Sequence, residues 1–172
     1  MNVDAEQVVR IVVTAAEFDW TWSEQDIERF AAAMGWDLMN QRPGSGATMR
    51  THLAIESPYA HAYVNGDLKE ITLGVTDKFD TADRAGKETL ARYFQQLGQS
   101  AKAQLGDARI EVLSQGFGLR YHWAKPMVFV ELVANSNISL TLTNPMYRAW
   151  MQSVTAEYDE GGWVWGQESV RN

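Results

Sequence analysis

The chain contains no cysteine, and this absence removes several classes of protein. Without cysteine there is no disulfide framework, no thiolate zinc site and no cysteine nucleophile. The absence also favours a reducing compartment. The first residues lack the basic start and the uninterrupted apolar stretch that would indicate a signal peptide. We therefore expect a cytoplasmic protein.

Long apolar runs are also missing. The longest, such as residues 127–130 and 132–134, fall far short of the roughly 20 residues that cross a bilayer. Positive charge is scarce, because 15 Lys and Arg stand against 22 Asp and Glu and leave a formal net charge of −7. This balance repels nucleic acid and anionic lipid, and it suits either a basic partner or simple solubility. We expect a soluble protein that binds neither membrane nor nucleic acid.

The sequence motifs of common enzymes are absent. There is no dinucleotide-binding glycine motif, no phosphate-binding loop and no Gly-x-Ser-x-Gly nucleophile motif. The pattern of a calcium-binding EF-hand loop is missing as well. We therefore expect no catalytic residue, no metal and no cofactor.

Two groups of ionisable residues still deserve weighing. The three histidines, His52, His61 and His122, fall in expected strands, and none has a metal-binding spacing. His52 and His61 could face one another across a hairpin. Three acids lie three residues apart near the start of an expected helix: Asp77, Asp80 and Asp83. Helix starts favour acids through capping and the helix dipole, so these carboxylates need no metal to explain them.

Helical periodicity and capping signals predict four helices. The first follows Asp4 and runs to about residue 16, although its valine-rich run also suits a strand. In the second, Ser23 and Asp26 resemble a capping box and Gly35 is a natural terminator. The third and longest opens at residue 80 or 81 and ends near 105, with Gly98 as a point where it could break. The fourth follows the Asn144-Pro145 pair and ends near residue 158.

Between the helices, the pattern changes to short strands. The first group covers residues 48–55, 59–64 and 68–75, after a loop at residues 42–46. The second group covers residues 109–113, 119–123, 127–134 and 138–143. Short connections imply antiparallel pairing. We therefore predict one α+β domain over residues 1–172. Its antiparallel sheet has two meanders and a long central helix, with the N- and C-terminal helices packed on one face or at the ends.

Aromatic content is high, with seven tryptophans. Large aromatic side chains dominate both cores and protein interfaces. We assign Trp20, Trp123 and Trp150 to the core. Trp163 and Trp165 lie in a glycine-rich tail, where one is expected to dock on the body and the other to contact a partner.

Several segments together resemble a known family. They are residues 18–22 before the second helix, the Tyr63-Val64-Asn65-Gly66 hairpin, the long helix of residues 80–105, and the ending at residues 163–165. In this layout the chain resembles the actinobacterial immunity factors that neutralise secreted necrotizing toxins with NAD-glycohydrolase activity. The resemblance implies a non-enzymatic cytoplasmic inhibitor that binds the toxin domain and blocks its NAD-binding cleft.

The turn signal at residues 65–67 gives this inhibitor an expected contact site. Asn65, Gly66 and Asp67 form a narrow hairpin tip that could enter such a cleft, supported by the loop of Gly116, Phe117 and Gly118 and by the Trp163 and Trp165 tail.

Two other readings stay open. One is a small-ligand-binding or chaperone-like module with a groove between sheet and helix. The other is an unrecognised hydrolase or transferase that brings Glu70, His52 and His61 into one pocket.

Overall fold

The computed structural model describes residues 4–112 and 118–160 and places them in one sheet with four helices. The helices are α1 (Ala5–Glu17), α2 (Asp26–Met34), α3 (Arg84–Leu105) and α4 (Pro145–Glu160). The strands are β1 (Asp37–Arg42), β2 (Gly46–Arg50), β3 (Tyr59–Asn65), β4 (Asp67–Gly74), β5 (Arg109–Val112), β6 (Leu119–Ala124), β7 (Phe129–Ala134) and β8 (Ile138–Thr143). The predicted α+β class is confirmed.

All eight strands belong to one antiparallel sheet in the order β1-β2-β3-β4-β8-β7-β6-β5. The two predicted meanders are its two halves. They join because β4 pairs with β8, which places Ile71 opposite Leu142. The helix α3 connects the halves, so the last strand of each meander lies at the centre of the sheet.

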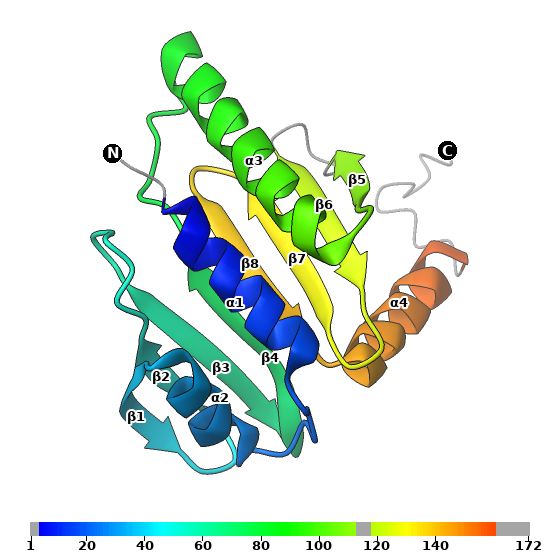
Figure 1. The fold of residues 1–172 in the computed structure, drawn as a ribbon. Coiled ribbons are helices and arrows are strands. Elements are labelled where there is room, and N and C mark those ends of the chain that lie inside the picture. The colour runs from blue at the N-terminus through cyan, green and yellow to red at the C-terminus, as the bar shows by residue number, and fades with distance from the viewer. Residues whose placement is uncertain (1–3, 113–117, 161–172) are drawn as a thin grey trace, which may run out of the picture.

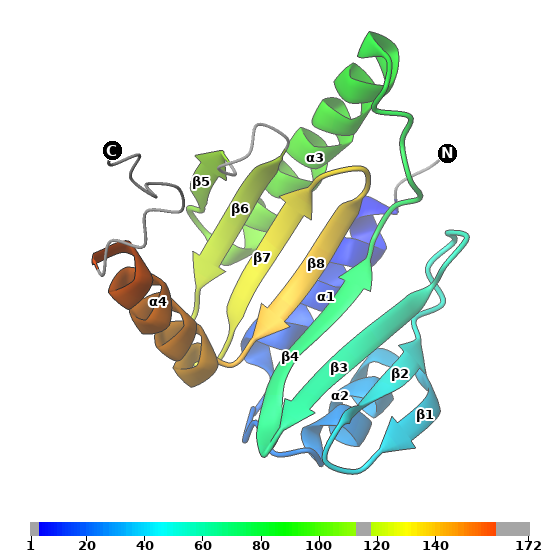
Figure 2. The ribbon, with the colours of Figure 1, turned by 180° about the vertical axis from the view of Figure 1, so that it is seen from behind.

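Helices cover one face of the sheet and leave most of the other face open (Figures 1 and 2). The helices α1 and α3 lie side by side over the central strands, and α2 lies over the β1 end. Successive strand residues point to opposite faces. In β3, for example, Ala60, Ala62 and Val64 are buried beneath the helices, whereas the alternate residues Tyr59, His61 and Tyr63 are exposed.

The core lies between this helical layer and the sheet. Its largest fully buried side chains come from α1, α2 and α3 and from the central strands, and they include Ile11, Phe30, Phe94, Ile71, Leu132 and Leu140. Trp20 and Trp123 are buried as predicted, at 3% and 2% exposure. Trp150 is 57% exposed, so its assignment to the core was wrong.

The start of α2 differs from the predicted capping box. The residue before the helix is Gln25, and no side chain caps it. Ser23 therefore does not act as the N-cap. Asp26 is the first helical residue, and its buried carboxylate accepts the backbone N–H groups of Thr21 and Trp22. The helix does end at Gly35, whose φ of 70° is left-handed, as the sequence predicted.

The long helix α3 begins later than predicted and does not break. Asp83 is its N-cap, and the Asp83 Oδ1 atom accepts the N–H of Gly86 at 2.6 Å. Gly98 lies within continuous helix. A Cβ atom at Gly98 would lie 2.4 Å from Cε2 of Tyr121 on β6. Glycine is therefore present because the helix and the sheet approach closely there, and its effect is on packing.

The β1 end of the sheet also departs from the prediction. β1 was not predicted, and residues 42–46 form the tight turn between β1 and β2, where Ser45 N–H donates to Arg42 O at 2.9 Å. β2 ends at Arg50, short of the predicted residue 55. The chain then turns away through His52, which has a φ of 60°.

Candidate functional site

The open face of the sheet carries a continuous row of polar side chains. Directly opposite residues on neighbouring strands form this row across seven strands: Thr48, His61, Thr72, Thr141, Glu131, His122 and Arg109. An antiparallel sheet often has one face on the core and one in water. Here the open face is polar, although His122 and Glu131 within the row are each only 8% exposed.

The β3–β4 hairpin ends at the tip that the sequence predicted. Asn65 pairs with Asp67 across Gly66, which has a φ of 77°, and all three residues are exposed. The residues next to the tip form hydrogen bonds with neighbouring loops. Leu68 N–H donates to Trp22 O at 2.9 Å, and Val64 N–H donates to Ser45 O at 3.3 Å. These bonds give the tip a fixed support.

An aromatic cluster lies beside this hairpin on the open face. The ring centroids of Tyr63 on β3 and Tyr147 on α4 are 6.4 Å apart. Tyr147 also stacks on Trp150, with centroids 5.9 Å apart and planes at 16°. Tyr63 is 44% exposed, and Met146 nearby in sequence is 82% exposed. We name the residues Tyr63, Asn65, Gly66, Asp67, Tyr147 and Trp150 the hairpin–aromatic surface.

Asn144 fixes α4 beside the hairpin. Its Oδ1 atom accepts the N–H of Met146 at 3.0 Å, which caps the helix as the Asn-Pro signal predicted. Its backbone N–H donates to Lys69 O at 2.9 Å, and its Nδ2 atom donates to Leu68 O at 3.3 Å. Hydrogen bonds of Asn144 therefore hold the first turn of α4 against the first residues of β4.

Negative charge lies beneath the aromatic cluster. Glu70 stands opposite Tyr63 in the sheet. Burial, and then the Glu131 carboxylate, raise the pKa of Glu70 above its ordinary value. The pKa of Tyr147 is raised by loss of hydration, then by Glu70 and then by Tyr63. Glu131 is paired with Arg120 at 2.9 Å, so Glu70 is the less compensated of the two carboxylates.

Among the other predicted contact residues, only Gly118 is described, and it does not lie at this surface. Gly118 is half-buried just before β6. It lies at the opposite end of the sheet from the hairpin tip, because Leu119 pairs with Ala134 and Ala134 with Ile138 at the far end of β8 from Asn144. Gly116, Phe117, Trp163 and Trp165 lie outside the described residues.

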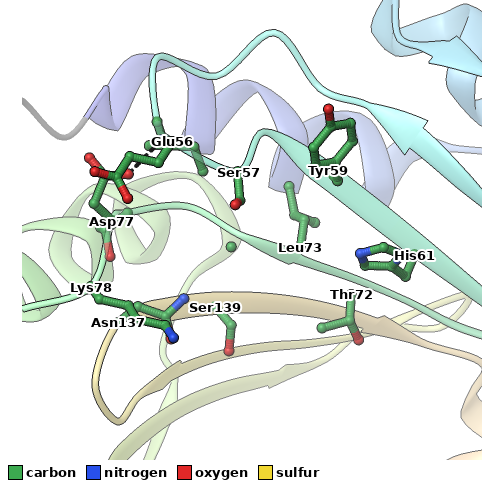
Figure 3. A pocket seen from close by; sticks show the side chains of 13 residues that line it. Glu56, Ser57, Tyr59, His61, Thr72, Leu73, Asp77, Lys78, Asn137 and Ser139 are labelled. Atoms are coloured by element: carbon green, nitrogen blue, oxygen red, sulfur yellow. Dashed lines mark hydrogen bonds between the residues drawn. The ribbon is translucent and has the colours of Figure 1, made fainter. Parts of the chain in front are cut away.

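A cleft of about 560 Å³ lies on the open face, near the end of β3 that is farther from the hairpin tip (Figure 3). Tyr59 and His61 of β3, Thr72 of β4 and Ser139 of β8 line it. Neither His52 nor Glu70 is among its lining residues. This cleft therefore does not bring together His52, His61 and Glu70, as the hypothesis of a hydrolase or transferase required.

His52 and His61 contact different residues. His61 Nδ1 lies 3.3 Å from Thr48 Oγ1, whereas His52 Nε2 lies 3.2 Å from a carboxylate oxygen of Asp37. The prediction that His52 and His61 could face one another was wrong, because β2 ends before His52 and Thr48 occupies the place opposite His61.

The three acids near α3 act in separate turns. Each accepts one backbone N–H: Asp77 from Glu56, Asp80 from Ala82 and Asp83 from Gly86. Within residues 4–112 and 118–160, no group of three or more His, Cys, Asp or Glu could hold a metal ion. In the same part of the chain, no helix has the length and apolar character needed to span a membrane.

These features define an α+β protein with an open polar sheet face and an aromatic patch at one corner. The chain belongs to a protein family of unknown function, DUF6301, whose model matches residues 6–144. The match includes the hairpin and stops before α4. No curated protein matches the chain.

One solved structure is similar to the chain at a low level. It is a DUF4309 family protein, YjgB from Bacillus subtilis, with 14% sequence identity and a TM-score of 0.37. The alignment covers 81% of this chain and 97% of that chain. A likeness this weak carries no functional argument.

Sequence reasoning missed Tyr147 and Trp150 as surface residues. No local signal marked their exposure, because Tyr147, Met151 and Val154 recur at helical spacing, which is also typical of a helix that buries one face.

Proposed function

We propose that the protein is a non-enzymatic binding module that contacts another protein through the hairpin–aromatic surface. The observation that carries this proposal is the exposure of Trp150 and Tyr63 on rigid elements beside an exposed hairpin tip. Exposed tryptophan and tyrosine with restricted motion are the residues that most often dominate binding energy at interfaces. Ordering them in a complex costs little entropy, because packing already limits their conformations.

The proposed partner is a secreted NAD-glycohydrolase toxin domain, and the protein would be its cytoplasmic immunity factor. The resemblance of the sequence to that family supports this choice. The charge agrees with it, because a cleft that holds a dinucleotide pyrophosphate is usually electropositive. Asp67 at the tip and Glu70 beneath the aromatic rings supply negative charge on a chain of net charge −7. Inhibition would follow from occlusion of the cleft by the hairpin.

The first test is capture of the partner from the native cell with tagged wild-type and variant proteins. Trp150→Ala and Tyr63→Ala remove exposed aromatic rings, so we expect at least about tenfold less of the same partner, a loss of roughly 1.4 kcal/mol or more. The matched control is Tyr59→Ala. Tyr59 is an exposed tyrosine on the same face of β3 as Tyr63, at the other end of that strand. Equal capture by all folded variants would contradict the proposal.

A small-ligand-binding or chaperone-like module is the second candidate, and the 560 Å³ cleft favours it. The same variants separate the two functions, because Tyr59 lines that cleft and Trp150 does not. If Tyr59→Ala abolished binding of a co-purifying ligand while Trp150→Ala had no effect, the second function would replace the first.

A further inference from the structure

A second cleft, of about 550 Å³, lies between α4 and the ends of β6 and β7. It shares none of the residues of the hairpin–aromatic surface. Its walls combine cationic and apolar groups, chiefly Arg109, His122, Lys125, Phe129, Pro145 and Arg148.

Positive charge prevails in this cleft although the whole chain is acidic. Arg109, Lys125 and Arg148 supply three fixed positive charges. Asp107 is the one carboxylate among the described lining residues, and Lys102 already pairs with it at 3.1 Å. Glu111 stands opposite Arg120 on the neighbouring strand, and its carboxylate lies 3.7 Å from the Arg120 guanidinium. Glu131, opposite His122, pairs with the same Arg120 guanidinium at 2.9 Å, so Glu111 and Glu131 share one cation.

Two buried side-chain nitrogen atoms at the cleft have no aligned hydrogen-bond partner among the described residues. The Arg148 Nε atom is buried without a hydrogen-bond partner, while the guanidinium lies over the Phe129 ring at 4.6 Å from its centroid. The His122 side chain is only 8% exposed. Its Nε2 atom is 3.3 Å from Glu111 Oε1, but the two are not aligned as a hydrogen bond. Buried donors without acceptors are costly. The unpartnered Arg148 Nε donor indicates that another acceptor completes the site.

We propose that this cleft binds a small organic oxyanion, a carboxylate or a phosphate. Guanidinium groups bind either oxyanion through paired, charge-assisted hydrogen bonds. Arg109 and Arg148 approach the cleft from opposite walls, β5 and α4. The Phe129 ring, Pro145 and Ala149 offer an apolar surface to the organic part of the ligand. This site goes beyond the proposed partner binding and does not depend on it.

The test is calorimetric titration of the full chain with sodium phosphate and, separately, with sodium citrate, at constant ionic strength. We expect at least one probe to bind with a Kd below about 1 mM. Arg109→Gln and Arg148→Gln should each weaken that binding by about tenfold, the size of one charge-assisted hydrogen bond. Tighter binding of phosphate or of citrate identifies which oxyanion chemistry the cleft prefers.

Arg84→Gln is the matched control, because it removes the same charge from an exposed side chain at the start of α3. Its binding should equal that of the wild type. Arg148→Lys provides a second variant if Arg148→Gln does not fold, and it should also bind more weakly because it keeps the charge but loses the planar fork. A Kd above about 1 mM for both probes, or equal binding by cleft variants and control, would overturn the proposal.

Discussion

At the scale of single residues, Asp26 is a fully buried acid that organises the turn before α2. One of its oxygens, Oδ2, accepts the N–H groups of Thr21 and Trp22, each at 2.7 Å, and the other pairs with Arg29. These bonds hold Trp22 at a φ of 57°, which is unfavourable for a bulky side chain. The carboxylate thus supports the aromatic core, where Trp20 and Trp22 stack at 4.4 Å.

Replacing Asp26 by alanine should lower the free energy of unfolding by about 3–5 kcal/mol, because the N–H groups of Thr21 and Trp22 and the Arg29 guanidinium lose their buried acceptor. Urea denaturation measures this change. Glu28→Ala removes an exposed acid from the same helix and should cost about 0.5 kcal/mol or less. Similar losses in the two variants would show that the network around Asp26 adds no stability.

Glu70 gives a prediction that depends on pH. Because its pKa is raised in the folded protein, the native state holds this proton more tightly than the unfolded state does. The resulting stability is present below the unfolded pKa of about 4.3 and is lost as pH rises through the folded pKa. Glu70→Gln removes this loss, so the variant should be more stable than the wild type at about pH 7. The advantage should disappear near pH 4.

Unfolding free energies of both proteins at the two pH values check this prediction. Glu17→Gln supplies the control, because it makes the same substitution at an exposed position. A Glu70→Gln variant whose difference from wild type is the same at both pH values would mean that the carboxylate is not destabilised by its surroundings.

At the scale of elements, the contact between α3 and β6 depends on Gly98. Helix propensity alone predicts that alanine at this position stabilises the helix. The structure predicts the opposite, because the new Cβ would lie 2.4 Å from the Tyr121 ring. We expect Gly98→Ala to destabilise the protein by about 1–3 kcal/mol through overpacking. Gln99→Ala, at the exposed next position, should have almost no effect in the same denaturation experiment. A stabilised Gly98→Ala variant would favour propensity over packing.

The sequence predicted the elements that carry strong local signals. Capping at Asp4, termination at Gly35 and the Asn144-Pro145 pair are local chemistry, and the structure confirms all three. β1 was missed because residues 37–42 lie on an exposed edge, where no buried face imposes an alternating pattern. The pairing of β4 with β8 and the exposure of Trp150 are tertiary properties, which local patterns do not encode.

The candidate site was predictable to a similar extent. The tip at Asn65, Gly66 and Asp67 has a turn signature, so the sequence was sufficient to locate it. Its neighbours were not predictable, because α4 reaches the hairpin through tertiary contacts, those of Asn144 with Leu68 and Lys69 and that of Tyr147 with Tyr63. For the same reason, the sequence did not place Gly118 at the opposite end of the sheet.

At the scale of the whole molecule, the two faces of the sheet differ in what covers them. The helices α1, α2 and α3 bury one face and supply stability (Figure 1). These three helices lie behind the other face (Figure 2). That face carries the polar row, the two clefts and the hairpin–aromatic surface. In this arrangement, binding residues can change with little effect on the core.

The most direct test of the central claim is a titration of the proposed partner, an NAD-glycohydrolase toxin domain, with the purified protein while NAD consumption is followed. We predict that the wild type stops NAD consumption at an equimolar ratio. Asp67→Lys should inhibit more weakly, most clearly at low salt, because it reverses an attraction that salt screens. Glu6→Lys, the same charge change on an exposed residue of α1, should inhibit like the wild type. Continued NAD consumption with excess wild-type protein would contradict the immunity function, and full inhibition by a folded Asp67→Lys at low salt would remove the hairpin from the mechanism.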